Sequence, residues 1–199
     1  MKVLVIDTAT NLLVVGLKND DKNIIRTRLG KNDNAAYLVN EIEVLLNEEN
    51  IKLENLDKII VGIGPGSYTG NRVAVVVAKT LAYSKNIKLE QISSLIFLSS
   101  GYENITAAID ARRGFYFANN HTFGKSISGD KYISLDNLKE NKDYIILNED
   151  TIKVDLDIII NNSEEVKDVF LLEPNYLRKT EAENEYDQKN GIKWHCKCC

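Results

Sequence analysis

One short pattern occurs in both halves of the chain: an apolar run that ends in Ile-Asp, then a polar turn and a second apolar run. The first copy links residues 2–7 to residues 12–17, and the second links residues 105–110 to residues 115–119. Apolar, largely β-branched runs of this length are typical of buried strands, so each copy predicts a hairpin. Because the pattern recurs at long range, it indicates two related subdomains.

Helical patterns alternate with strands in the first half. Asp33 or Asn34 can cap a helix that continues to about residue 47, and residues 71–84 predict a second helix. A buried strand is expected over residues 58–63, between these helices. Strands that alternate with helices are typical of α/β proteins, so we expect an α/β fold.

The length and composition fit two subdomains. The 199 residues, 44% hydrophobic and 27% charged, suffice for a substantial core. We expect an N-terminal subdomain over residues 1–100, a shortened second subdomain over 101–178 and a polar tail over 179–199. Weaker patterns in the second half predict strands near 143–147 and 157–161 and a helix near 163–170.

Charge, cysteine and histidine content limit the possible functions. The net charge is −4, whereas an autonomous nucleic-acid-binding protein is more often basic. All three cysteines lie among the last four residues, and the histidines are His121 and His195. The run from His195 to Cys199 places its ligands too close together for an ordinary zinc site. We therefore predict no metal and no cofactor, and interpret His121 as a structural residue.

A glycine-rich stretch lies between the strand 58–63 and the helix 71–84. Its residues are Gly64, Pro65, Gly66, Ser67, Tyr68, Thr69 and Gly70. Glycines that permit close approach, followed by the free N–H groups of a helix N-terminus, can hold a phosphate or carboxylate. The stretch lacks the Lys-Ser or Lys-Thr of a Walker loop. The alternative is a tight turn in which Ser67 or Thr69 caps the helix.

The two Ile-Asp turns also allow two interpretations, one functional and one structural. Asp7, followed by Thr8 and Thr10, resembles the first phosphate motif of actin-like ATPases and sugar kinases, although the usual glycine is missing. Asp110 is its counterpart and precedes Arg112 and Arg113. The alternative is that both aspartates stabilise their turns, and we favour it.

Both early helices have a broad apolar surface, which can be a buried layer or in part a site for a partner's helices. The residues that we expect to contact a partner are Ala35, Leu38, Val39, Ile42, Leu45, Leu46, Val73, Val76 and Val77.

Four stretches together resemble the bacterial TsaB family, the non-catalytic partner in threonylcarbamoyl-adenosine modification of tRNA. They are Leu4 to Thr10, Gly64 to Gly70 with Arg72, Ile109 to Gly114, and Pro174 to Arg178. They follow the family's order and cover roughly residues 1–180. The glycine stretch together with Asp110-Ala111-Arg112-Arg113 is specific to the family.

The resemblance implies an actin-like fold of the acetate kinase, sugar kinase and heat-shock ATPase class, with two subdomains of which the second is short. It implies a cytoplasmic subunit without chemistry of its own that binds and activates the transferase TsaD through its two early helices. It also implies recruitment of the ATPase TsaE and contact with tRNA only through the complex. Independently of the resemblance, an unsatisfied apolar helix face predicts possible homodimers in isolation, and the sequence has no run of about 18 apolar residues that would span a membrane. The His-x-x-x-His metal ligands of TsaD are absent from the corresponding residues 34–38.

An enzyme is the alternative function. A small actin-like kinase or ATPase would hold a nucleotide with Asp7 and the glycine stretch 64–70. No pattern in residues 101–178 predicts the adenine pocket that such an enzyme needs.

Overall fold

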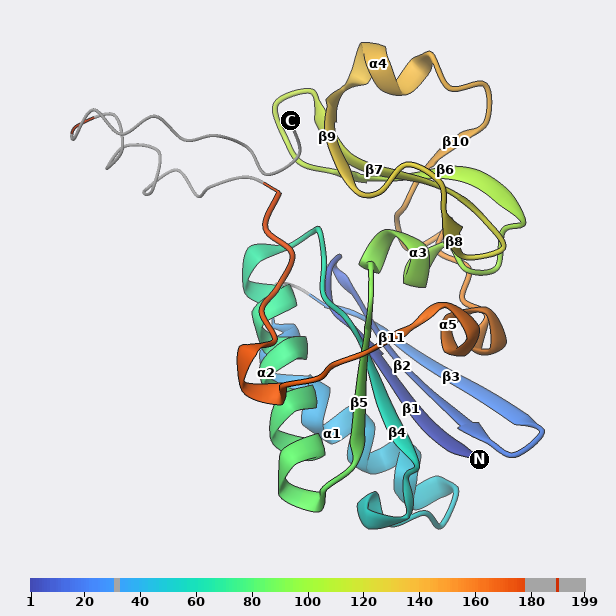
Figure 1. The fold of residues 1–199 in the computed structure, drawn as a ribbon, viewed down its shortest axis with the longest axis vertical. Helices are drawn as coiled ribbons and strands as arrows, with labels where there is room; N and C mark the ends of the chain where they lie inside the picture. The colour runs from blue at the N-terminus through green and yellow to red at the C-terminus, as the bar shows by residue number, and fades with distance from the viewer. Residues whose placement is uncertain (31–32, 178–188, 190–199) are drawn as a thin grey trace.

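The computed structural model describes residues 1–30, 33–177 and 189, which form two sheets (Figure 1). The first sheet has six strands in the order β11-β5-β4-β1-β2-β3. They are β1 (Lys2–Asp7), β2 (Leu12–Asn19), β3 (Lys22–Leu29), β4 (Lys58–Gly62), β5 (Lys88–Ile92) and β11 (Glu164–Glu165). β1, β4 and β5 are parallel, and β1–β2–β3 form an antiparallel meander.

The second sheet is smaller and is built on the second Ile-Asp hairpin. Its strands are β6 (Asn104–Asp110), β7 (Phe115–Thr122), β8 (Lys125–Ser126), β9 (Lys131–Ser134) and β10 (Tyr144–Ile146). β6 pairs antiparallel with β7 and parallel with β10. The repeated pattern therefore predicts the central hairpin of each sheet correctly.

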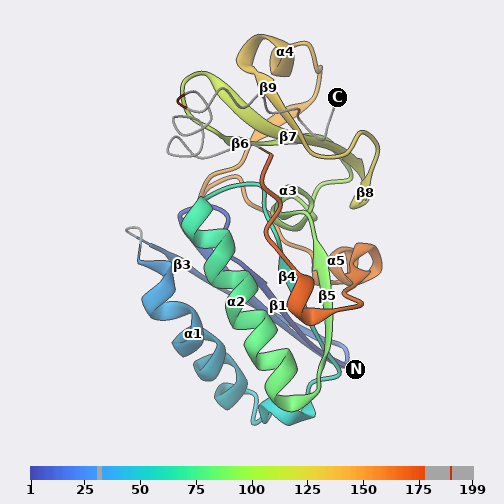
Figure 2. The same ribbon diagram turned by 60° about the vertical axis from the view of Figure 1, so that its left-hand side comes forward.

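The helices lie in two places relative to the sheets. α1 (Asn34–Glu48) and α2 (Tyr68–Lys85) lie side by side on one face of the first sheet (Figure 2). The short 3₁₀ segment η1 (Leu53–Asn55) follows α1. α3 (Ser94–Leu98) and α5 (Leu156–Asn162) lie on the opposite face, and α4 (Leu135–Lys139) packs on the second sheet.

Each face of the first sheet has its own hydrophobic core. One core joins β1, β2 and β4 to α1 and α2, and includes Leu38, Leu45 and Ala78. The other joins the opposite face to α3, α5 and the second sheet, with Phe97 among its fully buried residues. The second core connects the two subdomains and fixes how their loops meet.

Two expected elements are wrong. Residues 157–161 lie in helix α5 rather than in a strand, because Asp155 accepts hydrogen bonds from the N–H groups of Asp157 and Ile158 and so caps a helix. Residues 163–170 form β11 and the 3₁₀ segment η2 (Val169–Leu171) rather than a helix. β11 pairs with β5, so this part of the chain returns to the first sheet.

The division at residue 100 stays a prediction. The tail expected over residues 179–199 lies outside the described residues except for Lys189, as do Arg178, His195 and the three cysteines.

Candidate functional site

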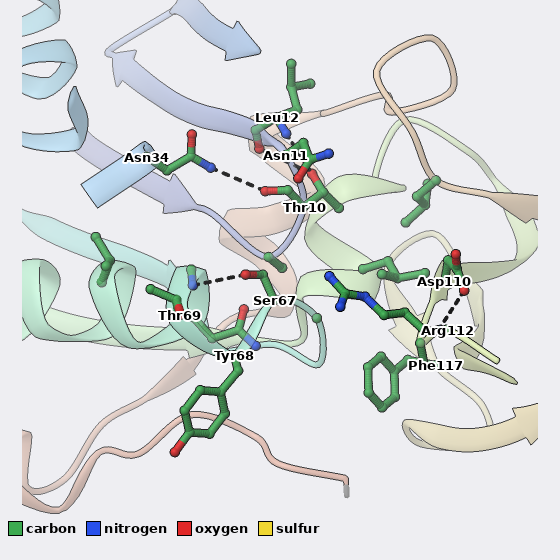
Figure 3. A pocket seen from close by; sticks show the side chains of 18 of the residues that line it. Thr10, Asn11, Leu12, Asn34, Ser67, Tyr68, Thr69, Asp110, Arg112 and Phe117 are labelled. Carbon is green, nitrogen blue, oxygen red and sulfur yellow. Dashed lines mark hydrogen bonds between the residues drawn. The ribbon is translucent and has the colours of Figure 1, made fainter. Parts of the chain in front are cut away.

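A cleft of about 700 Å³ opens where the polar turns of the two halves meet (Figure 3). Its walls come from the first Ile-Asp turn, the glycine stretch, the second Ile-Asp turn and the segment around Tyr176. Lining residues from the predicted set are Thr10, Ala35, Gly66, Ser67, Tyr68, Thr69, Gly70, Val73, Asp110 and Arg112. The fold therefore brings together four stretches that are far apart in the sequence.

The glycine stretch packs on the first Ile-Asp turn, backbone against backbone. A Cβ at Gly66 would collide with the carbonyl oxygen of Ala9, and one at Gly70 with the carbonyl oxygen of Thr8. The N–H of Ser67 donates to the Ala9 oxygen at 2.7 Å, and its hydroxyl accepts from the N–H of Gly70 at 3.2 Å, which caps α2. These contacts account for Gly66, Ser67 and Gly70 as a tight turn without a bound anion.

Asp7 does not line the cleft, because it is fully buried. One carboxylate oxygen accepts the N–H of Ala9 at 2.8 Å, and the other lies against Gly62 and Ser94. Burial raises the pKa of Asp7 to about 7, an effect that the Ser94 hydroxyl and the Ala9 N–H offset only in part. A carboxyl group in this position stabilises the turn and cannot touch a ligand in the cleft.

The two threonines of this turn also hold the backbone. The hydroxyl of Thr8 donates to the carbonyl oxygen of Gly70 at 2.7 Å, and the hydroxyl of Thr10 accepts the N–H of Leu12 at 3.1 Å. The preferred interpretation of the turn as structural agrees with these bonds.

The second Ile-Asp turn is exposed. Asp110 accepts the N–H of Arg112 at 2.7 Å, and Arg112 extends into the cleft, toward the side where Ser67 and Tyr68 lie (Figure 3). Arg112, Arg113 and Gly114 have φ values of 68°, 58° and 78°. Two successive non-glycine residues in the left-handed region carry strain of the kind that often accompanies a functional site.

Arg72 connects the glycine stretch to the closing motif. Its Nε donates to the Tyr176 hydroxyl at 2.8 Å, and its guanidinium lies 4.2 Å from the centre of the Tyr68 ring. The Tyr68 and Tyr176 rings are 5.2 Å apart. Arg72, Tyr68 and Tyr176 therefore join the end of the described chain to the start of α2.

Sequence reasoning missed Asp130, which joins three segments. One of its oxygens accepts from Ser93 Oγ and Asn119 Nδ2, each at 2.7 Å, and the other from Asn175 Nδ2 at 2.9 Å. Burial raises the pKa of Asp130, while these three donors act to lower it. A lone Asp in a polar loop gives no sequence signal for this role, because its partners come from distant elements.

His121 is buried in the second sheet, as a structural residue. Nδ1 accepts the N–H of Gly124 at 3.3 Å, so Nε2 carries the proton toward Ser99 Oγ, 2.7 Å away. Burial lowers the pKa of His121 and favours this neutral form. Among the described residues, no group of three His, Cys, Asp or Glu side chains could hold a metal ion.

The residues expected to contact a partner divide into two groups. Leu38, Ile42, Leu45 and Leu46 are enclosed between α1 and the first sheet, so the prediction that a partner touches them is wrong. They form the 3–4 spaced stripe by which a helix packs on its own core. Val39 and Val76 are 54% and 60% exposed. Ala35 is also exposed, and Val73 and Val77 are half-buried.

Comparisons with known proteins agree with the geometry. Residues 31–145 match the model of the TsaD family, which is described as tRNA N6-adenosine threonylcarbamoyltransferase. The tRNA threonylcarbamoyladenosine biosynthesis protein TsaB of Bacillus subtilis is 38% identical over 57% of this chain and 52% of its own length. TsaB of Escherichia coli is 29% identical over the same shares. The chain spans about half the length of the curated relatives it matches.

A solved structure extends the similarity of fold to most of the chain. YeaZ from Pseudomonas aeruginosa superposes with a TM-score of 0.71 and 20% identity, over 88% of this chain and 99% of that one. The fold is therefore the expected actin-like α/β fold with two subdomains. With the match over more than half of its residues, the chain belongs to the TsaD family and, within it, to the TsaB proteins.

Proposed function

We propose that this chain is an accessory subunit of tRNA threonylcarbamoyladenosine biosynthesis that binds the transferase TsaD and holds it in an active state. The names of its curated relatives support the pathway. The observation that carries the proposed binding is apolar surface left open on the outer face of α1 and α2, at Val39 and Val76. Helix faces of this kind bury their apolar side chains against a partner's helices.

The other parts of the proposal follow from this arrangement. The complex, rather than this chain alone, would present the surface that recruits TsaE and contacts tRNA in the cytoplasm. A chain with a net charge of −4 offers little general attraction to phosphate. In isolation, the same face would favour a homodimer. No described helix is long and apolar enough to cross a membrane.

The position of Asp7 favours this role over the alternative, an ATPase or kinase. Such an enzyme needs a carboxylate that reaches a metal-bound nucleotide, but Asp7 is sealed beneath Gly62 and Ser94. We therefore expect calorimetry with Mg²⁺-ATP to give no micromolar binding to the isolated chain. Micromolar binding that Asp7→Asn abolishes would favour the enzyme.

The test of the proposed binding uses exposed residues, so that the fold survives the substitution. Val39→Glu with Val76→Glu places two charges on the outer helix face, and we expect co-purification with TsaD to be lost. The control is Ile25→Glu with Leu29→Glu, which are also exposed. These two lie on the face of β3 opposite α1, because Arg26 and Arg28, between them in sequence, point toward α1 and its start. Undiminished co-purification of the Val39 and Val76 variant would contradict the proposal.

A further inference from the structure

The last described part of the chain runs along α2, on the side away from α1 (Figure 2). We call residues 166–177 the strap. The strap begins where the N–H of Val166 donates to the carbonyl oxygen of Leu89, and Leu172 inserts into the core beneath α2. The outer face of the first subdomain thus has three neighbouring ridges, α1, α2 and the strap.

Side chains of α2 and of the second subdomain fix the strap. Lys79 Nζ donates to the carbonyl oxygens of Phe170 and Leu172 at 2.9 and 3.0 Å. Asn175 donates its N–H to the carbonyl oxygen of Ile63 at 2.7 Å and its side-chain amide to Asp130. The strap is therefore attached at both ends and in the middle.

Between these attachments, the strap turns two large apolar side chains outward. Phe170 and Leu171 are 67% and 76% exposed. They lie in η2, which Asp168 caps by accepting the N–H of Phe170 at 2.8 Å. Apolar side chains on a fixed backbone lose less conformational entropy on binding than those on a free segment. The arrangement is that of a preorganised contact.

This apolar pair continues the open surface of α2. The ring of Phe170 packs edge-on against Tyr83, with the centroids 5.0 Å apart. Tyr83 and Val76 are two turns apart on α2, and both are exposed. These four exposed side chains form a row along α2 and the strap, with Lys79 and Thr80 between Val76 and Tyr83, beside the helix surface to which we assign TsaD.

We propose that Phe170 and Leu171 form a third docking element for TsaD, beside α1 and α2. This inference rests on the proposed function, because it assigns the strap to the same partner. The partner's apolar helix surface would cover the row from Val76 to Leu171, and the contacts from Lys79 and Asn175 would hold the strap in place for it.

The test compares two double variants of the full chain in titrations with TsaD. Phe170→Asp with Leu171→Asp places charge on the strap, and we expect at least about tenfold weaker binding, as for central apolar contacts of an interface. The control is Phe123→Asp with Ile127→Asp, two exposed apolar residues of the second subdomain, for which we expect unchanged binding. Circular dichroism and thermal melting establish that each variant is folded.

The outcomes separate the two proposals. If the unaltered chain binds TsaD and the strap variant binds equally well, the strap is no docking element, while the helix surface stands. If the unaltered chain does not bind TsaD, the proposed function fails and this inference fails with it. If the double variant does not fold, Leu171→Ser replaces it, because this side chain is outside the core and Phe170 stays against Tyr83. Binding by Leu171→Ser as tight as that of the unaltered chain would then overturn the inference.

Discussion

The two Ile-Asp hairpins have similar sequences and opposite surroundings. Asp7 is enclosed by Gly62 and by Ser94, and its pKa is raised to about 7. Asp110 is exposed at the cleft, and its carboxylate accepts the N–H of Arg112 in the same turn. The difference lies in what packs on each turn rather than in the hairpins themselves. One copy is part of the frame, and the other is available to a ligand or partner.

The largest expected difference between the copies is in the pH dependence of stability. Because the pKa of Asp7 is raised from 3.8 to about 7, the folded state binds its proton more tightly than the unfolded state does. Its contribution to the free energy of unfolding is therefore present below about pH 4 and is lost as the pH rises to about 7, by roughly 4 kcal/mol. Asp7→Asn should remove this loss, so that the variant gains stability relative to the unaltered chain toward pH 8.

Asp110→Asn is the matched control for this measurement. Denaturant unfolding of both variants and of the unaltered chain between pH 4 and 8 separates the contribution of Asp7 from those of other groups. If the free energy of unfolding of the Asp7→Asn variant depends on pH as that of the unaltered chain does, ionisation of Asp7 does not lower the stability of the fold.

A smaller difference is expected at one glycine from each region. A Cβ at Gly62 would collide with the Asp7 carboxylate, whereas one at Gly114, beside Asp110, meets nothing within 4 Å. Gly62→Ala should lower the free energy of unfolding by about 3 kcal/mol. Gly114→Ala should lower it by about 1 kcal/mol, from its φ of 78° alone. If denaturant unfolding shows that the two variants lose equal stability, the packing of Gly62 on Asp7 is looser than described.

The smallest expected effect concerns strain in the exposed turn. Arg112 has a φ of 68°, which a glycine adopts freely. Arg112→Gly should therefore raise the free energy of unfolding by up to about 1 kcal/mol, although it removes a cation from the cleft. The gain in the free energy of unfolding, measured with denaturant, should then be unrelated to any change in the affinity for TsaD. A clear loss of stability would show that the arginine side chain stabilises the turn.

The parts of the structure that follow from local pattern could be predicted. Both hairpins, α1, α2 and the cap at Ser67 depend on neighbouring residues, and the sequence predicts all of them. Leu38 and Val39 show what local pattern cannot predict. They are adjacent apolar residues on one helix, but Leu38 is buried and Val39 is exposed, because only Leu38 faces the sheet. The burial of Asp7 also depends on a distant contact, with Ser94.

The second half was harder to predict for a related reason. The three successive isoleucines that begin at Ile158 have high strand propensity, but the cap from Asp155 and the packing of Ile159 in the core make the segment a helix. The sequence singles out the last residues of the strap as a motif but does not predict that the strap packs on α2. Its position on α2 depends on contacts between residues far apart in sequence, because Lys79 bonds to Phe170 and Leu172, and Asn175 of the strap bonds to Ile63.

The chain enters and leaves the second sheet at adjacent points. Lys153 receives a hydrogen bond from the N–H of Gly101 at 2.9 Å, and donates one to the carbonyl oxygen of Leu98 at 3.0 Å. The second sheet is thus an insertion whose two ends meet like the base of a closed loop. Such an insertion can shorten or lengthen during evolution without moving a strand of its host, so the helix face can stay constant while this part of the molecule varies.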